Sequence, residues 1–269
     1  MYERYARGEL PEGVAAMQAL LAADTAEAAR DGLIAGAEPL RPLLTAEAHA
    51  LVHAMLNLAS HHEPAGPEAW AATFDRAAAL SPEASVALYS LGDAERLAEA
   101  TREVADWLVE ERLVAPGRRV LEIGCGIGRF VAALAPRSRL TVGVDVSGRM
   151  CAEAAARTLG VEGAAVVRTA GRDLRAFADA AFDLVLAVDS WPYLVNAGVE
   201  AAMFAEACRV LTPGGDLVIV NWSYRADAEA DRADAATLAG RHGLRLRQDT
   251  GPALTHWNGA VFRFASGSG

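Results

Sequence analysis

The sequence predicts an α/β fold, in which a mostly parallel sheet follows a helical amino-terminal region. Three observations predict it. Strand and helix signals alternate after Pro116-Gly117, whereas before that point the apolar residues recur at helical spacing only. The first expected strand also runs directly into a glycine-rich turn. With 269 residues, 52% of them apolar, the chain is long enough to bury a core without disulfides or metals.

The amino-terminal elements are expected to be helices because of their start and stop signals. One apolar-periodic run extends from Pro11 to Leu21, and Thr45 is placed to cap a second run. A third run carries Trp70 and Phe74. Ser81 then precedes a proline in a typical helix start, and the longest run follows Gly92. Residues 1–115 are therefore predicted to form a helical cap with a lead-in helix, and residues 116–269 the α/β domain.

The second part alternates between short β-branched runs and helical segments, which predicts right-handed crossovers between parallel strands. Ser147 is expected to cap the helix that ends near Arg157. The strands are expected at 119–123, 140–144, 164–169, 182–188, 217–221, 244–246 and 261–264. Further helices are expected after the glycine turn up to Pro136, at 199–211 and at 227–242.

Composition excludes several classes of function. There are 35 acidic and 25 basic residues, for a formal charge of −10, so the surface repels nucleic-acid phosphates. All of the basic residues are arginine. Without lysine there is no Schiff base for pyridoxal phosphate and no P-loop. We therefore expect a small-molecule partner and no nucleic acid.

The cysteines and the amino terminus bear on the cellular compartment. Cys125, Cys151 and Cys208 are scattered and odd in number, which argues against a disulfide framework or a zinc knuckle. The first ten residues are polar and charged, unlike a secretory signal, and no apolar stretch has the ~18 residues that span a bilayer. A soluble, cytoplasmic protein without a membrane partner is expected. The sequence leaves the oligomeric state open.

The strongest motif is the segment Val120-Leu-Glu-Ile-Gly-Cys-Gly-Ile-Gly128. Its alternate glycines let the backbone turn tightly and let a ligand approach the main chain. Glu122 places a carboxylate at the strand edge where open α/β sheets bind ligands, and it suits a cationic amino group better than a pyrophosphate. Asp145 ends the next strand, where it can accept both hydroxyls of a ribose.

Together with later segments, this constellation resembles the class I S-adenosylmethionine-dependent methyltransferases over roughly residues 117–265. Gly171-Arg-Asp-Leu174, Phe182-Asp-Leu-Val185 and Leu211-Thr-Pro-Gly-Gly215 match further family segments in order. The resemblance implies a Rossmann-like sheet of seven strands in the order 3-2-1-4-5-7-6, with the last strand antiparallel. It also implies S-adenosyl-L-methionine as the cofactor.

The resemblance further implies the cofactor contacts. Glu122 would contact the methionine end, the three glycines the cofactor backbone and Asp145 the ribose, while Asp173 and Leu174 would border the adenine. The inserted Arg172 departs from the common Gly-Asp pattern there. An aromatic residue upstream, Tyr89, would cover the cofactor, or simply pack in the interior. The complete expected set is Tyr89, Glu122, Gly124, Cys125, Gly126, Gly128, Asp145, Val146, Met150, Arg172, Asp173, Leu174, Val188, Asp189 and Ser190.

The segment after the fourth strand, Ala187 to Tyr193, is the candidate acceptor side. Aromatic faces stabilise a sulfonium cation by ~1–2 kcal/mol when desolvated, so Trp191 and Tyr193 are candidates to face the sulfonium or the substrate. The alternative is that they pack the cap against the sheet. The sequence Asp189-Ser-Trp-Pro-Tyr lacks the acid–Pro-Pro–aromatic pattern of the enzymes that methylate nucleic-acid bases.

Histidines offer one candidate base and one candidate metal pair. His256 is the residue we nominate as general base, because imidazole titrates near neutral pH. The alternative is a solvated loop histidine. His49 and His53 have the i,i+4 spacing of helical metal ligands, but no H-E-x-x-H pattern surrounds them. An Asp-Asn pair typical of metal-assisted catechol methylation is also lacking in the sequence, so we expect a metal-independent enzyme.

The sequence therefore predicts methyl transfer from S-adenosylmethionine to an oxygen or nitrogen of a small molecule, driven mainly by proximity and orientation. Two alternatives remain. One is a catalytically silent S-adenosylmethionine-binding partner of another enzyme. The other is a nicotinamide-dependent oxidoreductase, disfavoured by the glycine spacing, by Glu122 and by the lack of a Tyr-x-x-x-Lys pair.

Overall fold

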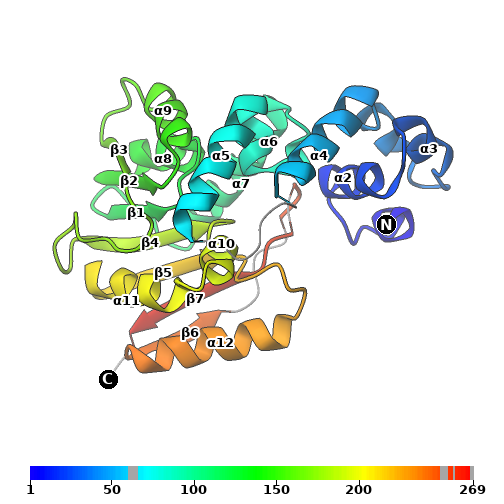
Figure 1. The fold of residues 1–269 in the computed structure, drawn as a ribbon. Helices are drawn as coiled ribbons and strands as arrows, with labels where there is room; N and C mark the ends of the chain where they lie inside the picture. Colours follow the sequence, from blue (N-terminus) through cyan, green and yellow to red (C-terminus); the bar gives the residue numbers. More distant parts are fainter. Residues whose placement is uncertain (60–65, 249–253, 257, 267–269) are drawn as a thin grey trace. The chain divides into compact units, whose positions relative to one another are not determined.

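The computed structural model describes residues 1–59, 66–248, 254–256 and 258–266 (Figure 1). The α-helices are α1 (Tyr2–Ala6), α2 (Glu12–Ala22), α3 (Ala26–Asp31), α4 (Ala46–Ala59), α5 (Pro67–Leu80), α6 (Pro82–Val86), α7 (Ala94–Glu110), α8 (Arg129–Leu134), α9 (Gly148–Arg157), α10 (Trp191–Asn196), α11 (Glu200–Val210) and α12 (Ala228–Arg241). The strands are β1 (Arg119–Ile123), β2 (Leu140–Asp145), β3 (Ala164–Arg168), β4 (Phe182–Val188), β5 (Leu211–Val220), β6 (Leu244–Gln248) and β7 (Val261–Ser266).

The chain divides into two compact units that interleave along the sequence. The helical unit takes its described residues from 1–62, 76–104 and 253–258, and the sheet unit takes them from 63–75, 105–252 and 259–269. The first part of α5 thus groups with the sheet, and its last residues group with the helices. The predicted boundary at residue 115 stays a prediction.

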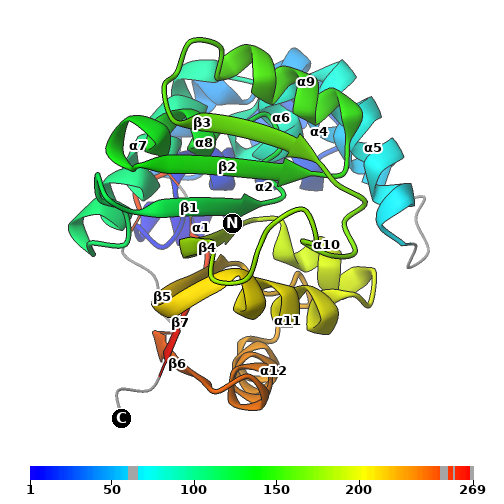
Figure 2. The ribbon, with the colours of Figure 1, turned by 90° about the vertical axis from the view of Figure 1, so that its left-hand side faces the viewer.

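The sheet unit has the predicted topology. Its seven strands lie in the order β3-β2-β1-β4-β5-β7-β6, and Figure 2 shows them side by side. β1 pairs in parallel with both β2 and β4, and β7 runs antiparallel to β5 and β6. The order reverses between β1 and β4, so the carboxyl ends of these two strands form the switch point at which α/β sheets bind ligands.

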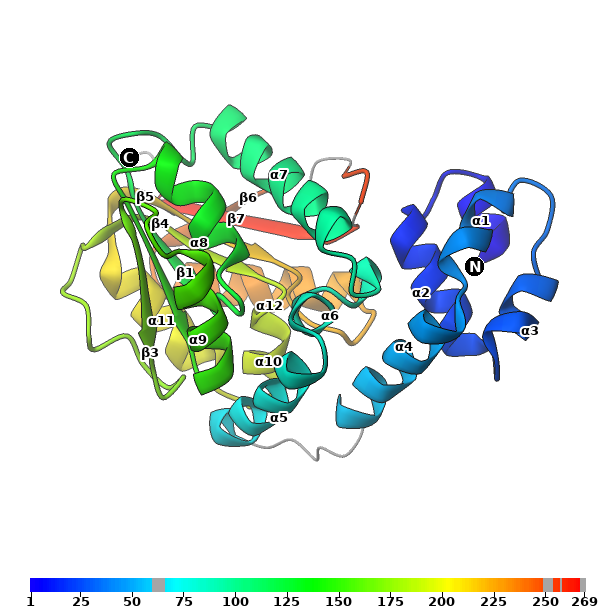
Figure 3. The same ribbon diagram turned by 90° about the horizontal axis from the view of Figure 1, so that it is seen from above.

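Side chains of alternating strand residues fill a core on each face of the sheet. The larger core joins Leu121 and Ile123 of β1 to buried residues of α11 and α12, including Phe204 and Leu238. A smaller buried group joins Val131 of α8 and Ala154 of α9 to residues of β3. Helices α8 and α9 lie side by side in Figure 3. Both faces are buried, as a parallel sheet requires.

The short helices α1 and α3 were not predicted from the sequence, and two features of the sheet unit also differ from the prediction. β5 begins at Leu211 instead of 217, because Leu211 pairs with Phe182 before a register shift at the Pro-Gly-Gly segment. Proline is tolerated at such a bulge. Helix α10, whose six residues begin with Trp191-Pro192 shortly after β4, was also not predicted from the sequence. A single helical turn or two carries too little periodicity to be recognised from spacing.

The helical unit owes its elements to the expected caps. Thr45 Oγ1 accepts a hydrogen bond from the N–H of Ala48 at 3.1 Å, and Ser81 Oγ accepts one from Ala84 at 3.2 Å. His49 and His53 each donate Nε2–H to a main-chain carbonyl oxygen, at 2.9 and 3.0 Å, which ties α4 to the carboxyl-terminal end of α2. Among the described residues, no helix is long and apolar enough to cross a membrane.

Candidate functional site

The glycine loop connects β1 to α8 at the switch point of the sheet. Gly124, Gly126 and Gly128 have φ values of +69°, +52° and +73°, a backbone region that other L-residues adopt only with strain. A Cβ atom on Gly124 would lie 2.3 Å from Cβ of Ser190, and one on Gly128 would lie 2.8 Å from Cβ of Ala154. The loop therefore requires glycine both for its turn and for its close packing.

Asp145 fastens this loop to the end of β2. Its Oδ2 accepts a hydrogen bond from the N–H of Gly126 at 2.8 Å, and its Oδ1 accepts one from Ser147 at 2.9 Å. The side chain is 8% exposed. Burial raises the pKa of Asp145 above its ordinary value, although the hydrogen bonds from Ser147 and Gly126 oppose that rise. A carboxylate offers about four acceptor sites, so Asp145 can accept a further donor such as a hydroxyl group.

Glu122 is a buried carboxyl group with an unused acceptor. It is 2% exposed, and among the described residues its Oε2 has no hydrogen-bond partner. Burial raises its pKa to about 8; Asp145 adds to the rise, whereas the Arg129 guanidinium opposes it. A buried polar atom without a partner is costly. A positively charged donor that entered the loop would satisfy Glu122 and favour its ionised form.

The raised pKa predicts that the free protein loses stability as the pH increases. Unfolded Glu122 ionises near pH 4.5, whereas the folded carboxyl group holds its proton up to about pH 8. The stabilisation is therefore complete below pH 4.5 and disappears as the pH rises through 8, by a few kcal/mol at ~1.36 kcal/mol per pKa unit. In Glu122→Gln this pH dependence should become shallower, and urea unfolding between pH 5 and 8.5 would measure it. Parallel curves for the two proteins would contradict the prediction.

The segment after β3 turns at Gly171 and carries the expected adenine residues. Gly171 has φ +69°, and its Cβ would lie 2.4 Å from Cγ1 of Val146. Arg172 extends outward to Glu68, with 2.8 Å between Nη2 and Oε1, and Asp173 pairs with Arg175 at 2.7 Å. Leu174 is 1% exposed and donates its N–H to Glu206 Oε2 at 2.8 Å.

The end of β4 lies directly against the glycine loop. Ser190 donates its hydroxyl to the carbonyl oxygen of Ile123 at 2.5 Å. Asp189 has a left-handed φ of +55°, and its Oδ1 accepts a hydrogen bond from Nδ2 of Asn221 at 2.6 Å. The ends of β1, β4 and β5 are thus joined through side chains. Of the remaining expected cofactor residues in this unit, Cys125, Met150 and Val188 are buried and Val146 is half-buried.

The two aromatic candidates on α10 lie in different surroundings. Trp191 is 0% exposed and packs at ring-centroid distances of 5.7 Å on Trp222 and 6.1 Å on Phe204. This environment is interior packing within the sheet unit, which differs from the alternative that Trp191 packs the cap against the sheet. Tyr193 is half-buried and contacts Trp70 and other aromatic rings at the edge of the sheet. The role of either residue in catalysis stays a prediction.

The first part of α5 supplies residues that the sequence analysis assigned to the cap. Trp70 and Phe74 meet Tyr193 edge to face, at centroid distances of 4.8 and 4.9 Å. Asp75 accepts hydrogen bonds from Ser147 Oγ at 2.5 Å and from the N–H of Arg149 at 2.9 Å. Residues 66–75 therefore run past the ends of β2, β3 and β4. Helical spacing alone could show that these side chains share a face, but not what they contact.

His256 and Tyr89 belong to the helical unit. Nε2 of His256 lies 3.2 Å from Glu99, and its Nδ1 lies 3.4 Å from Glu103. Tyr89 is 5% exposed, and its carbonyl oxygen would be 2.3 Å from a Cβ on Gly13. Their expected roles as base and cofactor cover stay predictions. Trp257, next to His256, lies outside the described residues.

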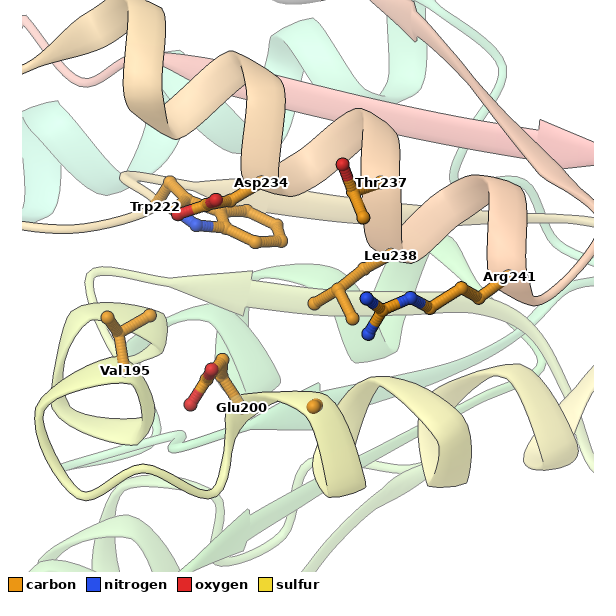
Figure 4. Close-up of a pocket in the computed structure, with 8 residues that line it drawn as sticks. Val195, Glu200, Trp222, Asp234, Thr237, Leu238 and Arg241 are labelled. Atoms are coloured by element: carbon orange, nitrogen blue, oxygen red, sulfur yellow. The ribbon is translucent and has the colours of Figure 1, made fainter.

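A cavity of about 210 Å³ lies in the sheet unit among α10, α11, α12 and the end of β5 (Figure 4). Its lining combines apolar atoms with acidic and basic groups. The residues around it are Val195, Glu200, Ala201, Trp222, Asp234, Thr237, Leu238 and Arg241. None of these residues belongs to the glycine loop or to the set expected at the cofactor, so this cavity is separate from the candidate site.

Comparisons with known proteins agree with this geometry. Residues 120–215 match the family model for a methyltransferase domain. Methyltransferase GfsG of Streptomyces halstedii is 33% identical over 128 residues, which are 46% of this chain and 45% of that protein. The 2-methyl-6-phytyl-1,4-hydroquinone methyltransferase of Synechocystis is 33% identical over 117 residues, 42% of this chain and 35% of that protein. The chain thus spans less than half the length of these curated relatives.

A solved structure shares the fold. Phosphoethanolamine N-methyltransferase 1 of Haemonchus contortus, in complex with phosphoethanolamine and S-adenosylhomocysteine, superposes with a TM-score of 0.59. The alignment covers 76% of this chain and 50% of that one, at 15% identity. Residues 120–215, which match the family model, contain the glycine loop, Asp145 and the end of β4. They belong to a sheet with the expected strand order. The chain therefore shares the Rossmann-like fold of this solved structure, and its residues 120–215 match a methyltransferase domain.

Proposed function

We propose that this protein transfers the methyl group of S-adenosyl-L-methionine to an oxygen or nitrogen atom of a small molecule. The observation that carries the proposal is the glycine loop, whose three positive-φ glycines lie beside two buried carboxyl groups at the switch point of the sheet. This cradle suits a ligand with an ammonium group at one end and a ribose further along. The buried Oε2 of Glu122, which has no partner among the described residues, and the carboxylate of Asp145 fit those two groups.

The sheet unit contains most residues of the proposed cofactor site. Glu122 would hold the amino group of the methionine part, and Asp145 would hold the ribose. The glycine loop would contact the backbone of the cofactor between them. Asp173 and Leu174 would border the adenine, and Asp189 and Ser190 would lie near the sulfur. The other residues proposed at the cofactor are Tyr89, Cys125, Val146, Met150, Arg172 and Val188.

The chemistry needs little more than orientation. When bound, S-adenosylmethionine supplies an electrophilic methyl group on a positively charged sulfur atom. The protein has to hold the acceptor atom in line with that group and exclude water, and good alignment can contribute effective molarities up to ~10⁸ M. Tyr193 and its neighbours on α5 form a half-buried aromatic edge for this purpose. A metal ion is not required in this proposal.

Calorimetry with S-adenosylhomocysteine tests the cofactor assignment. We expect micromolar binding, about −8 kcal/mol. Asp145→Ala should weaken it by about 10- to 100-fold, because charge-assisted hydrogen bonds contribute ~1.5–3 kcal/mol each. Asp179→Asn provides a matched surface control, since Asp179 is exposed and pairs with Arg209, away from the glycine loop. Binding of NADH without binding of S-adenosylhomocysteine would overturn the proposal in favour of an oxidoreductase.

A further inference from the structure

Four contacting aromatic side chains from α5, α10 and the segment after β5 reach Asp189 through the hydroxyl of Tyr224, and we call this group with Asp189 the aromatic–acid cluster. Tyr193 is at its centre, with ring-centroid distances of 4.8 Å to Trp70, 4.9 Å to Phe74 and 5.7 Å to Tyr224. All three contacts are edge to face. The rings of Trp70, Phe74 and Tyr193 are half-buried, and Tyr224 is exposed. Their π-faces are therefore partly available to a ligand.

The carboxylate of Asp189 is oriented by the neighbouring strand through its Oδ1 atom. Nδ2 of Asn221 donates to Oδ1 at 2.6 Å, and the Tyr224 hydroxyl lies 3.4 Å from the same oxygen. Asn221 is itself fixed, because its Oδ1 accepts the N–H of Ala260 at 2.9 Å. Both of the contacts to Asp189 are to Oδ1 rather than to Oδ2. Both Asp189 and Asn221 have left-handed backbone angles, of +55° and +63°, a strain typical of functional positions.

The cluster adjoins the place where the methyl group is expected. Asp189 precedes Ser190, which hydrogen-bonds to the carbonyl oxygen of Ile123 and touches the glycine loop at Gly124. Glu122, proposed to hold the methionine end, belongs to the same strand as Ile123. An acceptor held by Asp189 would therefore be next to the sulfur-bearing part of the cofactor.

A carboxylate beside several aromatic faces has the chemistry of a cation site. Aromatic rings attract ammonium groups by ~0.5–2 kcal/mol each, most strongly when the site is partly desolvated. A neutral hydroxyl acceptor gains nothing comparable from the rings, and it would add no positive charge beside the half-buried Asp189 carboxylate. Arg129 is the cation that acts on Asp189 in the free protein, and it also acts on Glu122.

We propose that the acceptor is an amine, which binds in its ammonium form with Asp189 as its counter-ion and the aromatic rings as its walls. This inference rests on the proposed methyl transfer. The ammonium group gives one proton to Oδ2 of Asp189, which leaves a neutral amine. The amine nitrogen then forms a bond to the methyl carbon as the methyl–sulfur bond breaks. The bonding pair stays on sulfur, and the product is a methylated ammonium ion plus the neutral thioether.

The charge state of Asp189 adds a pH dependence. Burial raises the pKa of Asp189 to about 6, although the Asn221 hydrogen bond and the Arg129 charge oppose the rise. The other titratable groups that face it are the phenols of Tyr193 and Tyr224. The carboxylate is thus ionised at pH 7.5 and mostly protonated at pH 5. Cation binding should decrease about 10-fold over that range.

The first experiment measures cation binding without any turnover. Choline and its uncharged isostere 3,3-dimethyl-1-butanol are titrated into the protein saturated with S-adenosylhomocysteine, and binding is followed by NMR or calorimetry. We expect choline to bind at least 10-fold more tightly than the isostere. Asp189→Asn should remove that preference, and Tyr193→Leu should weaken choline binding more than Tyr193→Phe, which keeps the ring. Asp179→Asn should behave as wild type.

The second experiment measures turnover with paired acceptors. Phenethylamine and 2-phenylethanol are compared by release of S-adenosylhomocysteine, and only the amine should react. Asp189→Asn should reduce turnover about 100-fold, a larger factor than any accompanying loss of S-adenosylhomocysteine affinity. Equal binding of choline and its isostere, or methylation of the alcohol alone, would overturn the amine assignment. A protein that binds no S-adenosylhomocysteine would instead overturn the proposed methyl transfer itself, so the two failures are distinguishable.

Discussion

Gly124→Ala is expected to remove measurable S-adenosylhomocysteine binding and to lower thermal stability, whereas Gly117→Ala leaves both unchanged. An alanine at position 124 would have to keep φ near +69° and would place its Cβ 2.3 Å from Cβ of Ser190. Real side chains do not approach so closely, so the loop or the start of α10 must shift. A Cβ on Gly117 meets no atom within 4 Å, and its φ is not left-handed. Calorimetry and thermal melts of both variants measure the difference.

A double variant separates the clash from the backbone strain. Ser190→Gly removes the atom that the new Cβ would strike, so Gly124→Ala/Ser190→Gly should recover part of the stability lost in Gly124→Ala. Recovery should stay incomplete because the positive φ persists and because the hydrogen bond from Ser190 to Ile123 is lost. If Gly124→Ala bound S-adenosylhomocysteine like wild type, the loop could not be the cofactor cradle.

Trp191→Ala should destabilise the protein by about 3–5 kcal/mol, because it empties the space of a fully buried aromatic ring. The ring packs on Trp222 and Phe204 in the larger core, so its removal takes packing contacts away from both of these side chains. Urea unfolding gives the change in free energy. Trp191→Phe, which keeps an aromatic ring, should lose less than half as much.

The matched comparison is Tyr193→Ala on the same helix. Tyr193 is only half-buried, so its removal should cost less stability and, under the amine proposal, reduce turnover of the acceptor. If Trp191→Ala folded with wild-type stability but lost turnover, Trp191 would form part of the acceptor wall as the sequence first suggested. If Tyr193→Ala left turnover unchanged, the aromatic–acid cluster would not hold the acceptor.

Most of the fold could be predicted because its signals are local. Alternating apolar runs gave the seven strands, and Thr45, Ser81 and Ser147 each begin a helix as expected because a cap needs only its own side chain and the next three residues. The strand order followed from the family resemblance and is confirmed. Leu211 was missed as a strand residue because its pairing with Phe182 is a contact across 29 positions.

The candidate site could be predicted only where it is carried by one continuous segment. The glycine loop with Glu122 is such a segment, and Asp145 follows it at the end of the next strand. The contribution of Trp70 and Phe74 was not recognisable, because they meet Tyr193 across more than a hundred residues. The spacing of apolar residues on a helix predicts that one face is buried, but it does not identify the residues that pack on that face. For the same reason, the burial of Trp191 could not be distinguished from a role at the acceptor.

Helix α5 has a consequence for how acceptor choice can change in evolution. Its first part carries Trp70, Phe74 and Asp75 onto the sheet unit, although these residues precede the first strand by more than forty positions. A fragment beginning at residue 116 would keep the glycine loop but lack two walls of the aromatic–acid cluster and the hydrogen bonds of Asp75. Under the proposed function, recombination that exchanged the amino-terminal segment would change the acceptor preference and leave the donor site intact.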